Sequence, residues 1–261
     1  MTTNETVFKK IDSIIEKVKA HKVEPDFTNE LTERINRKPP KNLSDDELLR
    51  VYAILLAFSQ GANSEFVRDR LVLTGDFDKI FQNFSVDKVA KMDAEELKSK
   101  HWAKPLTYIR MKSKVDRIID FARKIKEHGS LSKIFTNSQI PKTIQSNSDI
   151  ATFWKAFDEL KALMKEREIS YLQSTTTLLH YLLDTGYDCI KPDSAVMGVA
   201  ERIGIVDNKA GDRNLRKTVN TLLEYSVARK LRPSEVDLYF LIAKPQEGAK
   251  KYVHKEFYSH L

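Results

Sequence analysis

The sequence predicts an all-α fold, and three observations support this prediction. Apolar residues recur with helical spacing along most of the chain, and no stretch of useful length alternates as a half-buried strand would. Only 8 Gly and 8 Pro interrupt the 261 residues. Hydrophobic residues make up 41% and charged residues 31%, which is typical of a globular protein. A chain of this length forms one large or two small domains.

Apolar faces and helix caps define the elements expected in the first half of the chain. Residues 44–47, Ser-Asp-Asp-Glu, form a capping box, and Asn63 or Ser64 can cap a further helix. Gly129 ends a strongly amphipathic helix. The expected helices lie at about residues 8–18, 48–58, 64 onward, 77–84, 86–92, 94–100 and 115–128.

The second half is expected to begin with a loop. Residues 130–147 are rich in Ser, Asn, Thr and Gln, with a short helix expected only near 131–135. Pro192 stands where a later helix would begin, and Gly204 where it stops. The remaining expected helices are residues 148–165, 174–185, 215–227 and 233–243. Residues 37–41, Arg-Lys-Pro-Pro-Lys, are interpreted as a basic linker.

Charge and cysteine content limit the classes of protein that remain. The net charge of +7 and the pI of about 9.2 permit nucleic-acid binding but support it weakly by themselves. The single cysteine, Cys189, excludes an internal disulfide and an all-cysteine metal site. The N-terminus lacks a secretory signal pattern, and no apolar run is long enough to span a membrane. We therefore expect a cytoplasmic protein, associated with the nucleoid if the source is bacterial.

Residues 170–204 carry the most informative pattern. A turn, Tyr171-Leu172-Gln173, leads into an apolar helix and a short loop, and then Lys191-Pro192-Asp193-Ser194-Ala195-Val196 opens another helix, with Arg202 further on. This pattern resembles the signature region of the helix-hairpin-helix DNA glycosylases, the superfamily of endonuclease III and the 3-methyladenine glycosylases. An aspartate opens the second helix in that family, so the resemblance implies that Asp193 is the catalytic carboxylate.

Two upstream segments agree with the same family in the same order. The segment Leu55-Leu56-Ala57-Phe58-Ser59-Gln60 is similar to the family's apolar helix ending in Ser-Gln. The segment Ser113-Lys114-Val115 is similar to its Ser-Lys pair that opens a helix. The resemblance covers roughly residues 48–204, and ordered agreement at three places is more specific than any one of these short motifs.

The resemblance implies a two-lobed helical glycosylase fold with a central cleft. One lobe, a helical barrel with a degenerate hairpin, would comprise residues 46–190, and the other residues 1–45 plus 191–261. The implied partner is double-stranded DNA with a flipped-out base, bound by a monomer. The side chains implied as DNA contacts are Gln60, Lys114, Tyr171, Gln173, Ser174 and Thr175.

The departures from the family pattern are as informative as the matches. The usual hairpin glycines, which let the backbone approach a phosphate, are replaced by Tyr171 and Gln173. Members that also cleave the strand carry a lysine 18 residues before the aspartate, where this chain has Thr175, which cannot form a Schiff base. No cysteine follows Cys189, so we expect neither the family's iron–sulfur cluster nor any other cofactor or metal.

The chemistry of base removal explains why one aspartate is sufficient. Breaking an N-glycosidic bond produces a cationic sugar, which a nearby carboxylate stabilises while it orients or deprotonates a water. Asp193 is also well placed to be an ordinary N-cap, and the two roles are compatible. Gln60 is equally consistent with a polar contact to the DNA gap and with a simple helix end before Gly61.

Other candidate residues have an ordinary structural interpretation beside the functional one. Three aromatic residues could stack on an extruded base but are more often core residues: Trp102, Tyr108 and Trp154. The basic cluster between Arg110 and Lys124 is more often a solvated helix face than a phosphate track. His180, in the middle of an apolar helix, is interpreted as structural.

These observations lead to one function and two alternatives. The leading hypothesis is a monofunctional DNA glycosylase of base-excision repair, without lysine-dependent lyase activity. The first alternative is a catalytically silent DNA-binding protein that keeps the glycosylase fold. The second is a helical protein–protein module unrelated to DNA.

Overall fold

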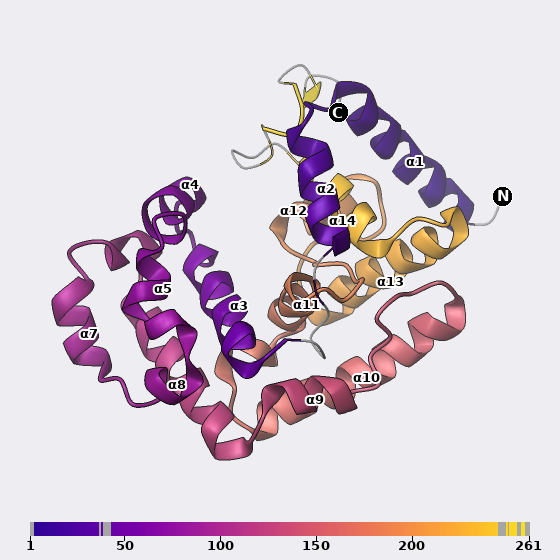
Figure 1. The fold of residues 1–261 in the computed structure, drawn as a ribbon. Helices are drawn as coiled ribbons and strands as arrows, with labels where there is room; N and C mark the ends of the chain where they lie inside the picture. The colour runs from indigo at the N-terminus through magenta and orange to yellow at the C-terminus, as the bar shows by residue number, and fades with distance from the viewer. Residues whose placement is uncertain are drawn as a thin grey trace. The chain divides into compact units, whose positions relative to one another are not determined.

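The computed structural model describes residues 3–36, 38, 43–244, 249, 251–254 and 257–258. Within these residues the chain is helical, and an isolated bridge between Lys22 and Val253 is its sole β pairing. The predicted all-α class is confirmed. The α-helices of Figure 1 are α1 (Thr3–His21), α2 (Asp26–Asn36), α3 (Asp45–Phe58), α4 (Ser64–Val67), α5 (Asp76–Ile80), α6 (Val86–Val89), α7 (Ala94–His101), α8 (Ser113–His128), α9 (Leu131–Asn137), α10 (Asn147–Glu166), α11 (Thr175–Asp184), α12 (Ser194–Arg202), α13 (Asp212–Arg229) and α14 (Pro233–Ile242).

Short turns of other helical geometry connect some of these helices. The segment η2 (Arg68–Val72) is a π-helical turn that continues α4. The segments η3 (Gln82–Phe84), η4 (Leu106–Ile109) and η5 (Ser170–Gln173) are 3-10 turns. None of the described helices combines the length and the apolar character needed to cross a bilayer.

The helices differ from the predicted ones at several places, and α2 was not predicted at all. Residues 77–84 do not form one helix, because φ is positive throughout η3 and α5 ends at Ile80. The short helix expected at 131–135 extends to Asn137. Pro192 does not open α12, which begins at Ser194 with Asp193 as its N-cap. The predicted basic linker falls, except for Lys38, outside the described residues.

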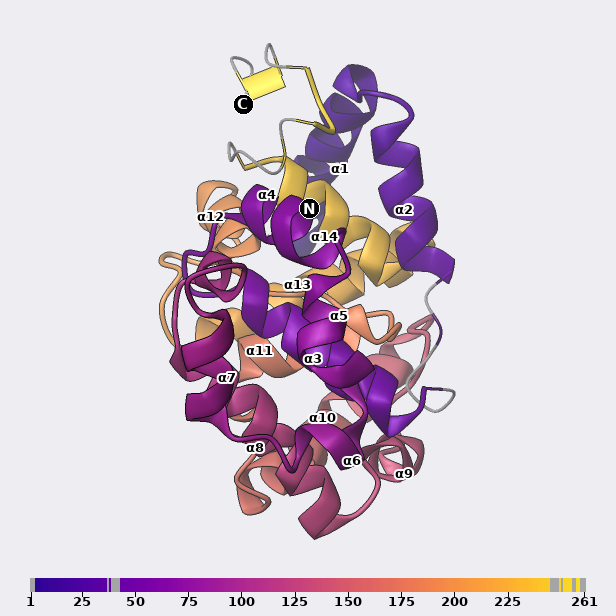
Figure 2. The ribbon, with the colours of Figure 1, turned by 60° about the vertical axis from the view of Figure 1, so that its left-hand side comes forward.

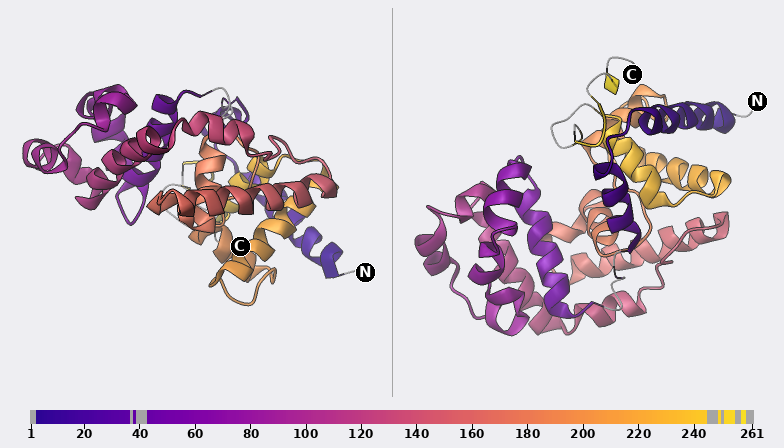
Figure 3. Two further views of the ribbon diagram at one scale, coloured as in Figure 1. Left: turned by 90° about the horizontal axis from the view of Figure 1, so that it is seen from below. Right: turned by 45° about the horizontal axis from the view of Figure 1, so that its top comes forward.

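The chain divides into two compact units. Unit 1 comprises Met1–Arg37, Ile140–Phe157 and Ser174–Leu261, and unit 2 comprises Lys38–Gln139 and Asp158–Gln173. The boundary falls inside α10, which is one unbroken helix (Figure 3). Residues 140–157 and 174–190, which the sequence-based division placed in the lobe 46–190, belong here to the unit that holds the chain's ends.

The core of unit 1 is built around α14. This helix is buried on nearly every side, and its neighbours are α1, α2, α12 and α13, which surround it in Figure 2. Phe240 and Val236 are fully buried, and Tyr239 packs against Phe27 of α2 with ring centroids 5.7 Å apart. Because α12 begins directly after residue 193 and packs against α14, this central helix holds the segment around residue 193 in place.

The core of unit 2 is formed by α3 against α8. The predicted capping box starts α3, because the Ser44 side chain accepts the Glu47 N–H while the Glu47 carboxylate accepts the Ser44 N–H. Tyr52 of α3 stacks on Phe121 of α8 at 3.9 Å between ring centroids. The end of α3 meets the first turn of α8, where Lys114 Nζ donates to Ser59 O, and this contact positions the turn that carries Gln60.

Candidate active site

Asp193 is the N-cap of α12 in unit 1. Its backbone is extended, with φ −80° and ψ −178°. Pro192 before it lacks the N–H that a helix interior needs, so α12 does not extend further toward the N-terminus. Its Oδ1 accepts the N–H groups of Ala195 at 2.8 Å and of Val196 at 3.0 Å. These bonds satisfy two of the free donors at the helix start, so the predicted capping role is confirmed.

The second oxygen of Asp193 is held by Lys191. The distance from Lys191 Nζ to Asp193 Oδ2 is 3.1 Å, and both side chains are largely shielded, with exposed fractions of 13% and 26%. Burial alone would raise the pKa of Asp193, but the Lys191 ammonium and the two helix N–H groups outweigh it and hold the pKa below its usual range. Asp193 is therefore a carboxylate at neutral pH, which is the form that stabilises a sugar cation.

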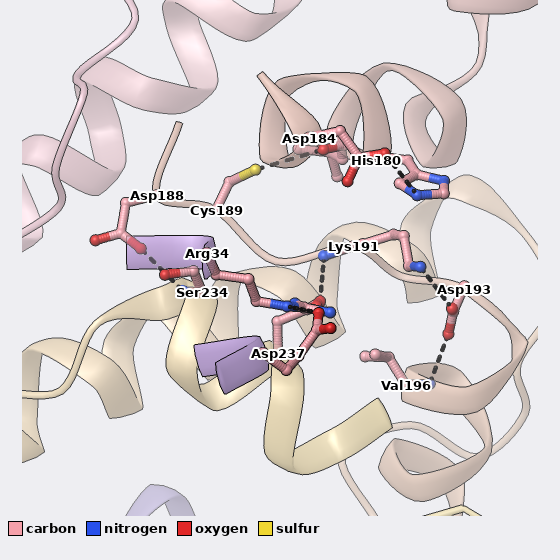
Figure 4. A network of polar contacts seen from close by, with 12 residues as sticks. Arg34, His180, Asp184, Asp188, Cys189, Lys191, Asp193, Val196, Ser234 and Asp237 are labelled. Atoms are coloured by element: carbon pink, nitrogen blue, oxygen red, sulfur yellow. Dashed lines mark hydrogen bonds and ion pairs between the residues drawn. The ribbon is translucent and has the colours of Figure 1, made fainter. Parts of the chain in front are cut away.

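The main chain of Lys191 is anchored from α14, as Figure 4 shows. Its N–H donates to Asp237 Oδ1 at 2.7 Å, while Asp237 Oδ2 accepts Arg34 Nη1 at 2.7 Å. Arg34 also donates to Glu30 at 3.0 Å. Burial alone would lower the pKa of Arg34, but these two carboxylates raise it above its ordinary high value. The loop before Asp193 is thus tied to two helices by a buried ion pair.

The remaining polar groups near this loop have structural partners. Asp188 accepts Arg232 Nε and the Ser234 N–H, each at 2.9 Å, which caps the start of α14. Cys189 is buried, and burial raises the pKa of its thiol well above the usual value, so it is a poor nucleophile. His180 pairs with Asp184 one turn later at 3.2 Å, which is consistent with its interpretation as structural.

The turn at residues 171–173 and the start of α11 lie where the chain passes from unit 2 to unit 1. Tyr171 and Gln173 lie in η5, both half-buried, with the Tyr171 ring edge against Tyr52 at 6.1 Å. Ser174 is the N-cap of α11 and accepts the Thr177 N–H at 3.2 Å. The side chain of Ser174 is exposed, so it has the open surface that a phosphate contact needs.

Thr175 stands 18 residues before Asp193, where strand-cleaving members of the family that the sequence resembles carry a lysine, and it is buried. Its hydroxyl donates to Asp212 Oδ1, and Asp212 also binds Arg216 Nε at 3.0 Å. The exposed fraction of Thr175 is 2%. This placement gives Thr175 a role in holding α11 to the start of α13, and it leaves no hydroxyl surface for a DNA contact.

Gln60 lies in a turn of unit 2 that two cations hold. The residue is exposed and has φ +54°, a conformation that non-glycine residues adopt rarely. Lys114 Nζ donates to Ser59 O at 2.7 Å, and Arg110 Nη1 donates to Gly61 O at 2.9 Å. The carbonyls on both sides of Gln60 are therefore fixed, and its side chain is presented at the surface.

Lys114 differs from its predicted role as a DNA contact. Its side chain has no exposed surface, and its ammonium binds backbone carbonyls at the negative end of α3. Burial, with help from the charges of Arg110 and Arg117, lowers the pKa of Lys114 to about 8. Because a buried ammonium cannot reach a phosphate, Lys114 shapes the Gln60 turn instead.

The three aromatic residues proposed for a base pocket fall in different units. Trp102 and Tyr108 are half-buried in unit 2; Lys112 Nζ lies 5.7 Å from the Trp102 ring centroid, and Tyr108 contacts the exposed ring of Phe66. Trp154 lies in unit 1, where its Nε1 donates to Asn220 at 3.3 Å and Arg216 stacks on its ring at 4.9 Å. Neither unit by itself therefore contains all three of these aromatic residues.

The basic cluster on α8 is largely engaged within unit 2. Arg123 donates to the carbonyls of Ala90 and Met92, and Lys124 pairs with Glu127 and Glu168. These contacts stabilise the packing of α8, so the ordinary interpretation of this cluster holds for these two residues. Among the described residues, no group of three His, Cys, Asp or Glu side chains is placed to hold a metal ion.

Three residues that matter for Asp193 were missed from the sequence. Lys191 stands two positions before Asp193 and carries a charge opposite to it, which was an available signal. Arg34 and Asp237 lie 203 residues apart, so no local pattern relates them.

The helical fold, with an aspartate N-cap that follows a short turn and an apolar helix, resembles that of a solved DNA glycosylase. No protein-family model and no curated protein matches the sequence. Among solved structures, the chain resembles the 8-oxoguanine glycosylase/lyase of Methanocaldococcus jannaschii in complex with 15mer DNA containing 8-oxoguanine. The TM-score is 0.55 at 16% identity, over 88% of this chain and 94% of that one. The all-α glycosylase fold implied by the sequence resemblance is thus confirmed.

Proposed function

We propose that this chain is a DNA glycosylase of base-excision repair that hydrolyses the N-glycosidic bond of a damaged or mispaired base. The observation that carries the proposal is Asp193, an ionised carboxylate fixed at the start of α12 in a glycosylase fold. Double-stranded DNA with a base turned out of the stack is the proposed substrate. We further propose that the protein acts as a cytoplasmic monomer without a cofactor.

In the proposed mechanism, Asp193 faces the sugar as its bond to the base breaks. Positive charge develops on the sugar, and the carboxylate stabilises this charge more strongly in the transition state than in the substrate. The same carboxylate orients a water that adds to the anomeric carbon. Because Ala195 and Val196 fix one oxygen, the carboxylate needs no reorganisation during the reaction.

The reaction is proposed to end at the abasic site. Strand cleavage by this superfamily needs an amine that forms an imine with the sugar, and Thr175 stands at that position with its hydroxyl bound to Asp212. The expected readout is base release without an adduct to abasic DNA under borohydride reduction. A trapped adduct would contradict the monofunctional assignment.

The experiment that tests the proposal is base release from a panel of duplexes. The panel carries 8-oxoguanine, alkylated, deaminated or mispaired bases, and the Asp193→Asn variant serves as the control. Release by the wild-type protein from at least one duplex, and its loss in the variant, is the expected result. Equal release by both proteins would remove Asp193 from the mechanism.

A second candidate function is that of a catalytically silent DNA-binding protein. It is favoured by the hairpin position, where Tyr171 and Gln173 replace the glycines that would allow close backbone contact with phosphate. Salt-sensitive binding to duplex DNA with no release from any duplex of the panel would select this candidate.

A further inference from the structure

Lys191 contacts Asp193 through both its side chain and its main chain. Its Nζ lies 3.1 Å from Asp193 Oδ2, and its carbonyl accepts the Asp193 N–H at 2.8 Å. Its own N–H is held by Asp237 at 2.7 Å. The two residues are therefore joined through both main chain and side chain, and the joint is fixed to α14 (Figure 4).

The ion pair that anchors this joint is costly as a purely structural device. The side chains of Arg34 and Asp237 have exposed fractions of 7% and 0%. A buried pair of this kind loses hydration on both ions, and apolar residues of similar size would stabilise the core at least equally well. The feature that apolar residues could not reproduce is the bond from Asp237 to the Lys191 N–H.

We propose that Lys191 is a positioning residue for Asp193: its ammonium is the counter-ion that holds the carboxylate oriented and ionised, and Asp237 with Arg34 fixes Lys191 in place. This inference rests on the proposed function of Asp193. DNA brings phosphate charges close to the site, and those charges favour protonation of a shielded carboxylate. A cation attached to the same loop opposes that effect.

The other charged groups around Asp193 do not replace Lys191. Asp237 from α14 is itself negative and is engaged by Arg34 of α2. Lys244, after α14, uses its ammonium to bind the Ser194 carbonyl at 2.8 Å rather than the carboxylate. Lys191 is thus the cation in direct contact with Asp193 among the described residues.

The experiment compares binding to two duplexes that differ in one positive charge. One duplex carries a pyrrolidine abasic-site analogue, whose ring nitrogen is cationic like the developing sugar, and the other carries a neutral tetrahydrofuran analogue. The ratio of the two affinities, measured from pH 3 to pH 8, reports the ionised carboxylate and does not require knowledge of the damaged base. The full chain is used as wild type and as the variants Lys191→Gln, Lys191→Arg and Asp193→Asn.

The expected wild-type ratio exceeds one at neutral pH and falls as Asp193 becomes protonated. In Lys191→Gln the midpoint of this fall moves to higher pH by about one unit, because an opposite charge in contact has been lost. Lys191→Arg keeps the midpoint near its wild-type value, since a guanidinium also pairs with a carboxylate. Lys209→Gln is the matched control, because Lys209 pairs with Glu201 at 3.6 Å on the surface of unit 1 and its loss leaves the midpoint unchanged.

The outcomes separate the inference from the function on which it rests. A ratio that Asp193→Asn does not change overturns the proposed role of Asp193, and the inference with it. If Asp193→Asn loses the preference for the cationic duplex, but wild type and Lys191→Gln share the same midpoint, the inference about Lys191 alone is overturned. An adduct with an abasic duplex under borohydride that is lost in Lys191→Arg makes Lys191 a nucleophile and also overturns it. Circular dichroism at each pH shows whether a variant remains folded.

Discussion

The ammonium of Lys114 donates to the carbonyl oxygen of Ser59 at 2.7 Å from a position without exposed surface. The contact joins the first turn of α8 to the end of α3 and helps to hold Gln60 at positive φ. The positive charge of Lys114 would suit a DNA-binding surface, but it is buried inside unit 2. It binds Ser59, the residue before Gln60, whose side chain is expected to face the DNA.

The first prediction concerns the pH dependence of this contact. The pKa of Lys114 is about 8 in the folded protein, against an ordinary value of 10.5, so the unfolded chain binds more protons between these limits. Stability contributed at this position therefore rises as pH increases from about 8 to about 10.5, by about 1–3 kcal/mol relative to a variant without the amine. Urea unfolding of wild type and Lys114→Met across this range measures the difference. A difference that stays constant with pH would show that the pKa of Lys114 is not lowered.

The second prediction concerns the glycine that follows Gln60. A Cβ at Gly61 would lie 2.3 Å from Arg110 Nη1, and the residue has φ +74°. Gly75, in the same unit, has φ +73°, but a Cβ there would meet no heavy atom within 4 Å. Gly75 therefore shares the backbone penalty of Gly61 without the collision.

We expect Gly75→Ala and Gly61→Ala each to cost about 1–2 kcal/mol, the usual penalty for this backbone region, because the Arg110 guanidinium at the end of a flexible side chain can move away from the new Cβ. Gly61→Ala should also displace Arg110 and weaken binding to an abasic-site duplex, whereas Gly75→Ala should leave binding unchanged. Thermal unfolding and duplex titration measure both effects. Equal binding by the two variants would remove the Arg110 contact as a determinant of the turn.

Much of the fold and part of this site followed from the sequence. Capping chemistry is local, so Ser44 with Glu47, and Asp193 before α12, were predicted from a few neighbouring residues. The buried position of Lys114 was also available, because it shares the helical face of Ile118 and Ile125 at spacings of 4 and 11 residues. Its charge led to the prediction of a DNA contact instead.

The anchoring of Lys191 could not be predicted in the same way. Arg34 and Asp237 lie far apart in sequence, and each stands in an amphipathic or apolar helix where a single charge has many potential partners. Tertiary packing of α2 against α14 selects this pair. Likewise, Thr175 is polar and begins a helix, so its burial could not be predicted locally. It is buried because its hydroxyl donates to Asp212, which lies 37 residues later in the sequence.

The third prediction tests the anchor itself. Replacing Arg34 by Met leaves Asp237 as a buried carboxylate without its counter-ion, which is expected to destabilise the protein by about 3–5 kcal/mol. The double variant Arg34→Met with Asp237→Leu removes both charges and should recover most of this loss. Urea unfolding checks the order of the three proteins. If the double variant is no more stable than Arg34→Met, the cost does not come from the unpaired carboxylate.

The fourth prediction separates the two roles of Asp193. Asparagine is as good an N-cap as aspartate, since its side-chain oxygen can accept the Ala195 and Val196 N–H groups. Asp193→Asn should therefore change the free energy of unfolding by less than about 1 kcal/mol. Its carboxamide is neutral, so the rate of base release should fall by about a hundredfold or more. Asp193→Ala removes both functions and should lose stability as well, by about 1 kcal/mol. Single-turnover base release and thermal unfolding of the two variants provide the measurement. A carboxamide variant that keeps the rate of the wild type would leave Asp193 with its capping role alone.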